Sequence, residues 1–132
     1  MKKITLFRDA ERYLHHLEEL LPSEEEFLKN KGHQYTVSML MLNIINNCID
    51  IGNEIITIKQ LDYPGTYREV FTILEKEKII THILNKKLQN LVGLRNLLAH
   101  EYGKINMELL HEAAKEVGFI EEYLKKTINY FK

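Results

Sequence analysis

Apolar residues recur along most of this chain at three- and four-residue steps, which is the spacing of one face of an α-helix. The pattern first predicts a helix from about Lys3 to Leu21, ended by Pro22. Ser23 and Glu26 then fit a capping box that opens a short helix ending before Gly32. The side chains expected to face inward from the first helix are Leu6, Tyr13, Leu14, Leu17, Leu20 and Leu21.

A second long helix is predicted from about His33 to Lys59, and it is apolar around most of its circumference. Such a helix is either central in a bundle or shared with a second subunit. Polar residues on this helix form one narrow line. The line is either an ordinary solvent-exposed face or the wall of a polar cavity; the second is favoured by its amides, because Lys and Glu are better helix formers for an exposed face. The line, with Asn46 beside it, consists of Asn43, Asn47, Asp50 and Glu54.

Turn and cap residues delimit the remaining helices. The turn at 62–65 precedes Thr66 and Glu69, a second capping box, and a helix is expected from Tyr67 to about Lys78. A further helix is expected from Thr81, its cap, to a stop at Gly103, and a last one from Met107 to about Phe131 after the cap Asn106. No alternating run predicts a strand. We therefore expect an all-α fold, one domain over residues 1–132, arranged as an antiparallel up-and-down helical bundle of four to five helices.

The helix after Thr81 carries an unexpected charge. Arg95 lies within about 20° of the centre of an apolar stripe, and Tyr102 follows on the same line two turns later. An unpaired charge in such a place is costly, so Arg95 requires an anionic or hydrogen-bonding partner. The stripe itself consists of Leu84, Leu88, Leu91 and Leu98.

Composition narrows the range of possible functions and locations. A net charge of -1 provides no overall attraction for nucleic acid, so any RNA or DNA contact has to be a local site. The one cysteine, Cys48, excludes an intramolecular disulfide and fits a reducing compartment. Charges soon after Met1 argue against a signal peptide, and the polar residues within 37–58 argue against a membrane span. We expect a cytoplasmic protein.

The common enzyme signatures are missing from the sequence. It has no Gly-rich phosphate loop, no Cys/His pair at metal spacing and no G-x-S-x-G turn. His15 and Glu19 are four residues apart, but such a pair arises easily by chance, and we expect no metal and no cofactor. Arg95 and His100 remain as the candidate catalytic residues.

These two residues belong to a longer pattern. The segment from Arg95 to Tyr102 reads R-x4-H-x-Y, with the polar residue Asn96 directly after the arginine. It resembles the motif of HepT-type toxins in the HEPN superfamily (higher eukaryotes and prokaryotes nucleotide-binding). The similarity extends in order over the 45–56 segment, the start of the helix at Tyr67 and the final amphipathic helix.

The resemblance implies a metal-independent endoribonuclease that forms a homodimer and acts as the toxin of a toxin–antitoxin pair, with RNA as the expected substrate and no DNA contact expected. In such pairs the antitoxin is a minimal nucleotidyltransferase, which silences the toxin by adenylylating the motif tyrosine, here Tyr102. The alternative is a catalytically silent helical subunit that presents substrate to a nucleotidyltransferase.

The residue chemistry agrees with a ribonuclease. His100 can act as base or acid, and Arg95 can hold a phosphate. On a regular helix, however, the two side chains diverge by about 140°. Either the helix ends or distorts at about Ala99, or an isologous dimer brings two copies of the site together. Candidates to hold Arg95 by hydrogen bonds are Asp50, Asn47 and Glu54; Tyr102 either packs below Leu98 or presents its hydroxyl near the site.

Overall fold

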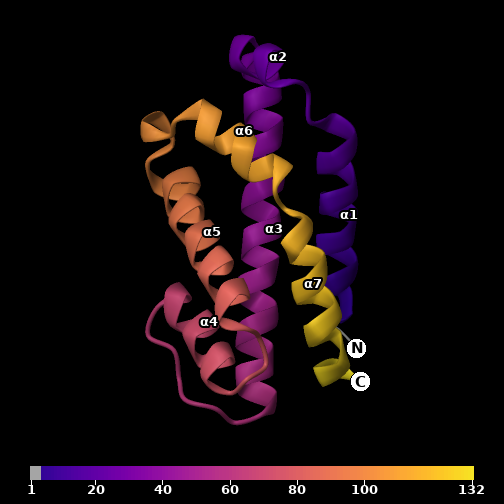
Figure 1. The fold of residues 1–132 in the computed structure, drawn as a ribbon, viewed down its shortest axis with the longest axis vertical. Helices are drawn as coiled ribbons and strands as arrows, with labels where there is room; N and C mark the ends of the chain where they lie inside the picture. Colours follow the sequence, from indigo (N-terminus) through magenta and orange to yellow (C-terminus); the bar gives the residue numbers. More distant parts are fainter. Residues whose placement is uncertain (1–3) are drawn as a thin grey trace.

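The computed structural model describes residues 4–132, and within this range the chain forms seven α-helices, two 3-10 helices and no strand (Figure 1). This confirms the expected all-α fold. In chain order the helices are α1 (Ile4–Leu20), α2 (Glu24–Lys29), α3 (Lys31–Ile58), α4 (Tyr67–Lys76), α5 (His82–His100), η1 (Tyr102–Lys104), α6 (Met107–Lys115), α7 (Gly118–Thr127) and η2 (Ile128–Phe131).

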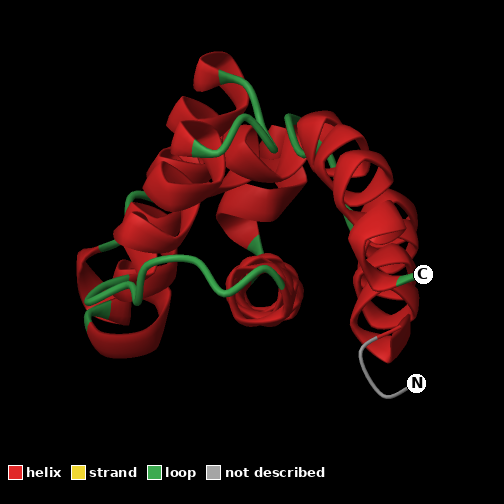
Figure 2. Cartoon of the chain, turned by 90° about the horizontal axis from the view of Figure 1, so that it is seen from below, coloured by secondary structure: helices red, strands yellow, loops and turns green. Residues whose placement is uncertain are grey.

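The longest helix, α3, is the centre of the fold. It contacts α1, α2, α4, α5 and α6. Figure 1 shows α4 and α5 on one side of α3 and α1 and α7 on the other. Figure 2, which looks along α3, shows the other helices in an arc around it. The apolar circumference predicted for this helix is therefore explained by neighbours on several sides.

The predicted helix caps are present. Each cap side chain accepts a hydrogen bond from a backbone N–H in the first turn of its helix: Ser23 from Glu26 (3.2 Å), Thr66 from Glu69 (3.1 Å), Thr81 from Leu84 (3.1 Å) and Asn106 from Glu108 (2.8 Å). The Glu69 carboxylate accepts from the Gly65 N–H at 3.0 Å, and so it also fastens the loop before α4. Helix α4 ends at Lys76, two residues earlier than expected.

The inward face of α1 differs in part from the prediction. Lys3, the expected first residue, lies outside the described residues. Leu20 is 52% exposed and does not face the core, whereas Phe7 and Ala10 do. The buried stripe runs Phe7, Ala10, Leu14 and Leu17, and the next position on it is Leu21, which packs against the core. Leu20 therefore falls to one side of the stripe by about 100°.

The predicted last helix, from Met107 to about Phe131, is wrong in its continuity. It is divided at Glu116 and Val117 into α6 and α7, and its end is the 3-10 helix η2. Gly118, the first residue of α7, is a weak helix former, so little helix-forming free energy is lost when the helix is interrupted just before it. In Figure 1, α6 crosses beside α3 and α7 then runs along it toward the C-terminus.

A buried hydrogen bond joins α7 to α3. The hydroxyl of Tyr123, which is fully buried, donates to the carbonyl oxygen of Cys48 at 2.8 Å. Burial raises the pKa of the Cys48 thiol to about 12. One turn further along α3, Gly52 has no side chain at a place where a Cβ atom would lie 2.5 Å from Val70 of α4. Gly52 thus permits α4 to lie close against α3.

Candidate functional site

Arg95 is half-buried on α5 and is held by uncharged groups. Its Nε donates to Oδ1 of Asn46 at 3.1 Å, and Nη1 donates to Oδ1 of Asn96 at 3.3 Å. The guanidinium carbon lies 4.6 Å from the centroid of the Tyr67 ring, which is a cation–π contact. No carboxylate of residues 4–132 forms an ion pair with Arg95. Its positive charge is therefore oriented but not neutralised.

The partner of Arg95 on α3 is Asn46, the residue beside the predicted polar line. Asn47, on the line, is half-buried, and its amide nitrogen has no hydrogen-bond partner within the described part of the chain. Asp50 is exposed, and its pKa is raised by desolvation and, secondarily, by the charge of Glu54. The amide of Asn46 orients the guanidinium without cancelling its charge.

His100 is the last residue of α5 and is exposed. Helix α5 ends at His100, one residue beyond the expected end at about Ala99. The residues from Arg95 to His100 are all helical, so their two side chains still leave the helix about 140° apart. Within residues 4–132 the imidazole makes no hydrogen bond. It is exposed and so accessible for proton transfer, and it leaves the helix in a different direction from Arg95.

Tyr102 lies beyond the end of α5 and not on its apolar line. Glu101 leaves the helical conformation (φ -138°, ψ 46°), and Tyr102 begins η1. Its ring stacks on Tyr35 of α3, with centroids 5.7 Å apart and planes at 23°. The Ser38 hydroxyl donates to the Tyr102 hydroxyl oxygen at 3.4 Å. These two contacts with α3 set the position of the phenol, and the side chain remains half-buried.

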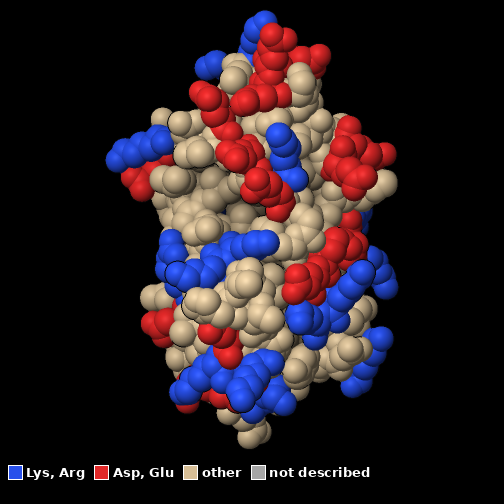
Figure 3. Space-filling model, viewed as in Figure 1, with Lys and Arg blue, Asp and Glu red and all other residues tan. Residues whose placement is uncertain are grey.

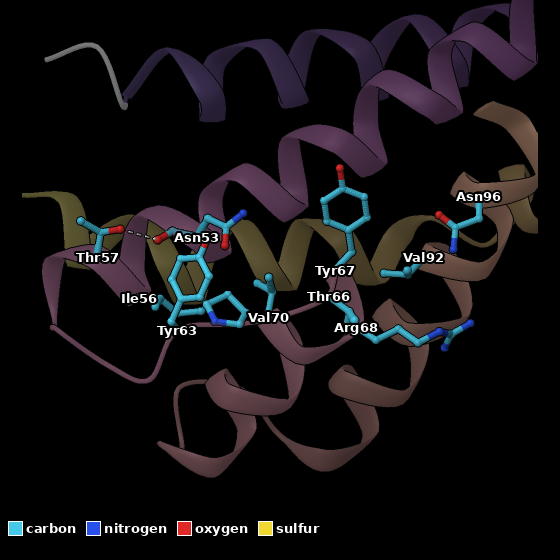
Figure 4. A pocket seen from close by; sticks show the side chains of 12 residues that line it. Asn53, Ile56, Thr57, Tyr63, Thr66, Tyr67, Arg68, Val70, Val92 and Asn96 are labelled. Carbon is cyan, nitrogen blue, oxygen red and sulfur yellow. Dashed lines mark hydrogen bonds between the residues drawn. The ribbon is translucent and has the colours of Figure 1, made fainter. Parts of the chain in front are cut away.

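A cavity of about 770 Å³ lies next to Arg95 (Figure 4). Two of its lining residues, Tyr67 and Asn96, are the same ones that contact the guanidinium. Its lining comes from α3, the loop before α4, α4 and α5: Asn53, Ile56, Thr57, Tyr63, Pro64, Gly65, Thr66, Tyr67, Arg68, Val70, Val92 and Asn96.

Several of these residues were missed in the sequence. The sequence marks Tyr67 only as the start of a helix. Its contact with Arg95 joins two helices that are distant along the chain, so no local pattern indicates it. The sequence likewise does not indicate that Tyr35 and Ser38 contact Tyr102. The one local peculiarity is that Tyr35 is an aromatic residue in the otherwise polar first turns of α3. Asn46 was recognised only as a neighbour of the polar line.

The surface charge is mixed. On the face shown in Figure 3, basic and acidic groups are interspersed, with acidic groups gathered toward the α2 end. This face therefore offers no continuous basic track for a nucleic-acid backbone. Among residues 4–132, no helix is long and apolar enough to cross a membrane, and no three His, Cys, Asp or Glu side chains gather as metal ligands.

A fold and a site of this kind define a helical protein in which an arginine without an ionic partner among the described residues is followed five residues later by an exposed histidine. A family model described as "Ribonuclease HepT-like" matches residues 10–127. The chain belongs to this family of ribonucleases, which confirms the resemblance found in the sequence and the expected ribonuclease class.

Two relatives named as nucleases are similar over most of the chain. An mRNA nuclease HepT from Shewanella oneidensis is 29% identical over 114 residues, which are 86% of each protein. A tRNA nuclease HepT from Aphanizomenon flos-aquae is 33% identical over 96 residues, 72% of this chain and 65% of that protein.

Solved structures share the fold. One is a toxin–antitoxin complex with AMP-PNP, whose matching chain has a TM-score of 0.84 and 25% identity, with 98% of this chain and 97% of that chain covered. Another is the tri-AMPylated HEPN toxin of Shewanella oneidensis with its MNT antitoxin, with a TM-score of 0.81, 24% identity and coverage of 97% and 92%. The second likeness, at this identity, concerns the fold alone.

Proposed function

We propose that this protein is a metal-independent endoribonuclease and the toxin of a toxin–antitoxin pair, with Arg95 and His100 as its catalytic residues. The observation that carries the proposal is the environment of Arg95. Amides and an aromatic face orient the guanidinium, and no carboxylate of the described residues competes for its charge. Such a group is suited to binding an RNA phosphate.

The reaction requires three things of the protein. A base removes the proton of a 2′-hydroxyl, the resulting oxygen attacks phosphorus, and the bond to the 5′-oxygen breaks as an acid returns a proton to it. Arg95 stabilises the negative charge that develops on the phosphate oxygens. His100 acts in proton transfer because imidazole both accepts and donates protons near neutral pH. One imidazole does not serve both proton transfers in the same step.

A homodimer supplies the missing group. Because Arg95 and His100 diverge on one regular helix, an isologous pair is the arrangement that surrounds one phosphate with both residue types and two histidines. Two large apolar side chains on α3, Tyr35 and Met39, are 60% and 59% exposed and lie on the helical face that also carries Asn46. Exposed apolar surface next to the site is suited to contact with a second copy.

Tyr102 is the proposed site of inhibition. A partner nucleotidyltransferase would transfer AMP from ATP: the phenol oxygen attacks the α-phosphorus, pyrophosphate leaves and the phenol proton is released. The Ser38 hydroxyl donates to the phenol oxygen, so the phenol's own proton is not used in that bond. A bulky anionic AMP at this position opposes RNA phosphate by size and by like charge. We propose a cytoplasmic location, because RNA and the ATP that this modification consumes are both present there.

The test is RNA cleavage by the purified protein in the presence of EDTA, together with growth arrest on expression. Arg95→Ala is expected to lower cleavage by about a hundredfold or more, and His100→Ala by about a hundredfold to ten-thousandfold. Matched controls are Arg12→Ala, which removes an exposed arginine that also lies over a tyrosine, and His16→Ala, which removes an exposed histidine of α1. Both should retain activity.

One outcome would reverse the proposal. If the wild type cleaves no RNA and arrests no growth, yet binds the transferase, the chain is the catalytically silent subunit. Tyr102→Phe separates inhibition from catalysis, because it should still cleave RNA but accept no AMP.

A further inference from the structure

The cavity beside Arg95 continues the site on the side of α4. The Tyr67 ring contacts the guanidinium and also lines the cavity, and Asn96 does the same from α5. A phosphate held by Arg95 would therefore lie at the edge of an open cavity of about 770 Å³, a volume within the usual range for small-molecule sites. The nucleotide that carries this phosphate has its base within reach of that space.

An aromatic side chain stands at the rim of this cavity. Tyr63 is 92% exposed, so its ring has almost no packing partner within the chain. The loop that carries it is nevertheless fastened, because Gly65 donates to the Glu69 carboxylate at 3.0 Å and Thr66 caps α4. An unstacked aromatic ring on a fastened loop is a suitable platform for a base of single-stranded RNA.

The cavity also offers unused polar groups. Asn53 lines the same cavity as Tyr63 (Figure 4), and the Asn53 side-chain amide makes no hydrogen bond within residues 4–132. Thr57, one turn on, donates its hydroxyl to the Asn53 backbone oxygen at 3.1 Å and keeps lone pairs free to accept. An amide places a donor and an acceptor side by side, which matches the donor and acceptor pairs on base edges.

The charge of the lining favours a base over a second phosphate. None of the twelve lining residues is acidic, and its one cation, Arg68, is turned toward α5, where it donates to the Gln89 backbone at 3.1 Å and to its side chain at 3.3 Å. The open part of the cavity is therefore aromatic and amide in character. Anionic phosphate is drawn to Arg95, and a neutral planar base fits the space beyond it.

We propose that this cavity is a nucleobase subsite, in which the base next to the scissile phosphate stacks on Tyr63 and presents its edge to Asn53. The proposal rests on the proposed ribonuclease function and adds to it the element that selects the base at the cleavage position. Tyr63 and Asn53 are binding residues, and neither takes part in proton transfer.

The probes are fluorescein-labelled 2′-O-methyl RNA hexamers of A, C, G or U, which lack the attacking hydroxyl and stay intact. An abasic hexamer of the same charge reports backbone binding alone. Fluorescence anisotropy of the full chain should show tighter binding of at least one hexamer than of the abasic strand. Tyr63→Ala should weaken that binding by roughly fivefold to a hundredfold and leave abasic binding unchanged, whereas Tyr63→Phe keeps the ring and retains the affinity.

Asn53→Leu keeps the size of the side chain and removes its hydrogen bonds, so it should reduce the difference in affinity among the four hexamers. Ile83→Ala, an exposed apolar truncation at the start of α5 outside the cavity, is the matched control and should change nothing. Arg95→Ala should weaken all hexamers and the abasic strand alike, because it removes the phosphate contact.

The outcomes separate this subsite from the function on which it rests. Equal binding of base-bearing and abasic strands by the wild type, or unchanged binding in Tyr63→Ala, overturns the subsite even where natural RNA is cleaved. If Tyr63→Ala weakens binding of the transferase but not of RNA, the cavity is a protein contact, and the subsite is wrong. Base-dependent binding without any cleavage of natural RNA supports the subsite and contradicts the ribonuclease function.

Discussion

The guanidinium of Arg95 lies over the ring of Tyr67, with its central carbon 4.6 Å from the ring centroid. Tyr67 is the first residue of α4, and Arg95 belongs to the last part of α5. The contact therefore fixes the position of the guanidinium relative to both helices. An aromatic face attracts a cation without neutralising it, unlike a carboxylate. The arginine is thus held in place while its charge remains available to an anion.

Replacing Tyr67 with leucine should lower kcat/KM for RNA cleavage by roughly twofold to thirtyfold, which is the range that a lost cation–π contact allows. Tyr67→Phe retains the ring face and should stay near the wild-type value. Tyr13→Leu is the matched control, since Tyr13 lies under Arg12 at 5.4 Å on α1, away from the site. Equal losses in Tyr67→Leu and Tyr67→Phe would instead assign the effect to the hydroxyl.

Gly52→Ala should destabilise the fold. Its Cβ would lie 2.5 Å from Cγ1 of Val70 and 3.2 Å from the Tyr123 hydroxyl, where α3 is crowded by two other helices. Overpacking of this kind costs about 1–3 kcal/mol, measured as a lower free energy of unfolding in urea. Gly118→Ala is the control, because nothing lies within 4 Å of its added Cβ, and this variant should be neutral or slightly more stable. An unchanged urea midpoint in Gly52→Ala would mean that α4 packs more loosely than observed.

Glu75 should make the free energy of unfolding depend on pH in the acidic range. Asn85 donates to its carboxylate at 2.7 Å and the His82 ring lies 3.0 Å from the same oxygen; these hydrogen bonds, that of Asn85 first, lower the pKa of Glu75 below its ordinary value of 4.5. A lowered pKa in the folded state adds stability above the unfolded pKa, and this contribution is lost as pH falls through the folded pKa.

The free energy of unfolding of Glu75→Gln should therefore fall below that of the wild type at neutral pH, and the two should converge as the pH is lowered from about 4.5. Urea titrations at a series of pH values measure this difference. Glu77→Gln, an exposed neighbour, should follow the wild type at every pH. A difference that grows toward low pH would contradict the assigned hydrogen bonds.

Local patterns were sufficient for most of the helices. Apolar periodicity located the long helices, and short cap motifs located their starts at Ser23, Thr66, Thr81 and Asn106, because both signals depend on residues within one or two turns. The ends were harder to predict. Helix α5 stops at His100 and not at Tyr102, because stacking on Tyr35 and the Ser38 hydrogen bond hold Tyr102 against α3.

The break between α6 and α7 was missed for a similar reason. The apolar repeat continues across Glu116 and Val117, so the sequence suggests one helix. The chain changes direction between α6 and α7 as it passes α3, and only the structure shows this (Figure 1). Burial on α1 likewise depended on how the helix is rotated against α3, which decided between Leu20 and Leu21.

The sequence by itself determined the helical class, the family and the motif residues Arg95, His100 and Tyr102, because periodicity and a spaced motif are properties of neighbouring positions. Only the tertiary structure decided what surrounds them. The Asn46 amide, the Tyr67 ring and the cavity beyond them meet Arg95 from separate helices, and such contacts depend on packing that no local spacing encodes. Whether Arg95 is a neutralised structural charge or one available to a phosphate is decided by those contacts.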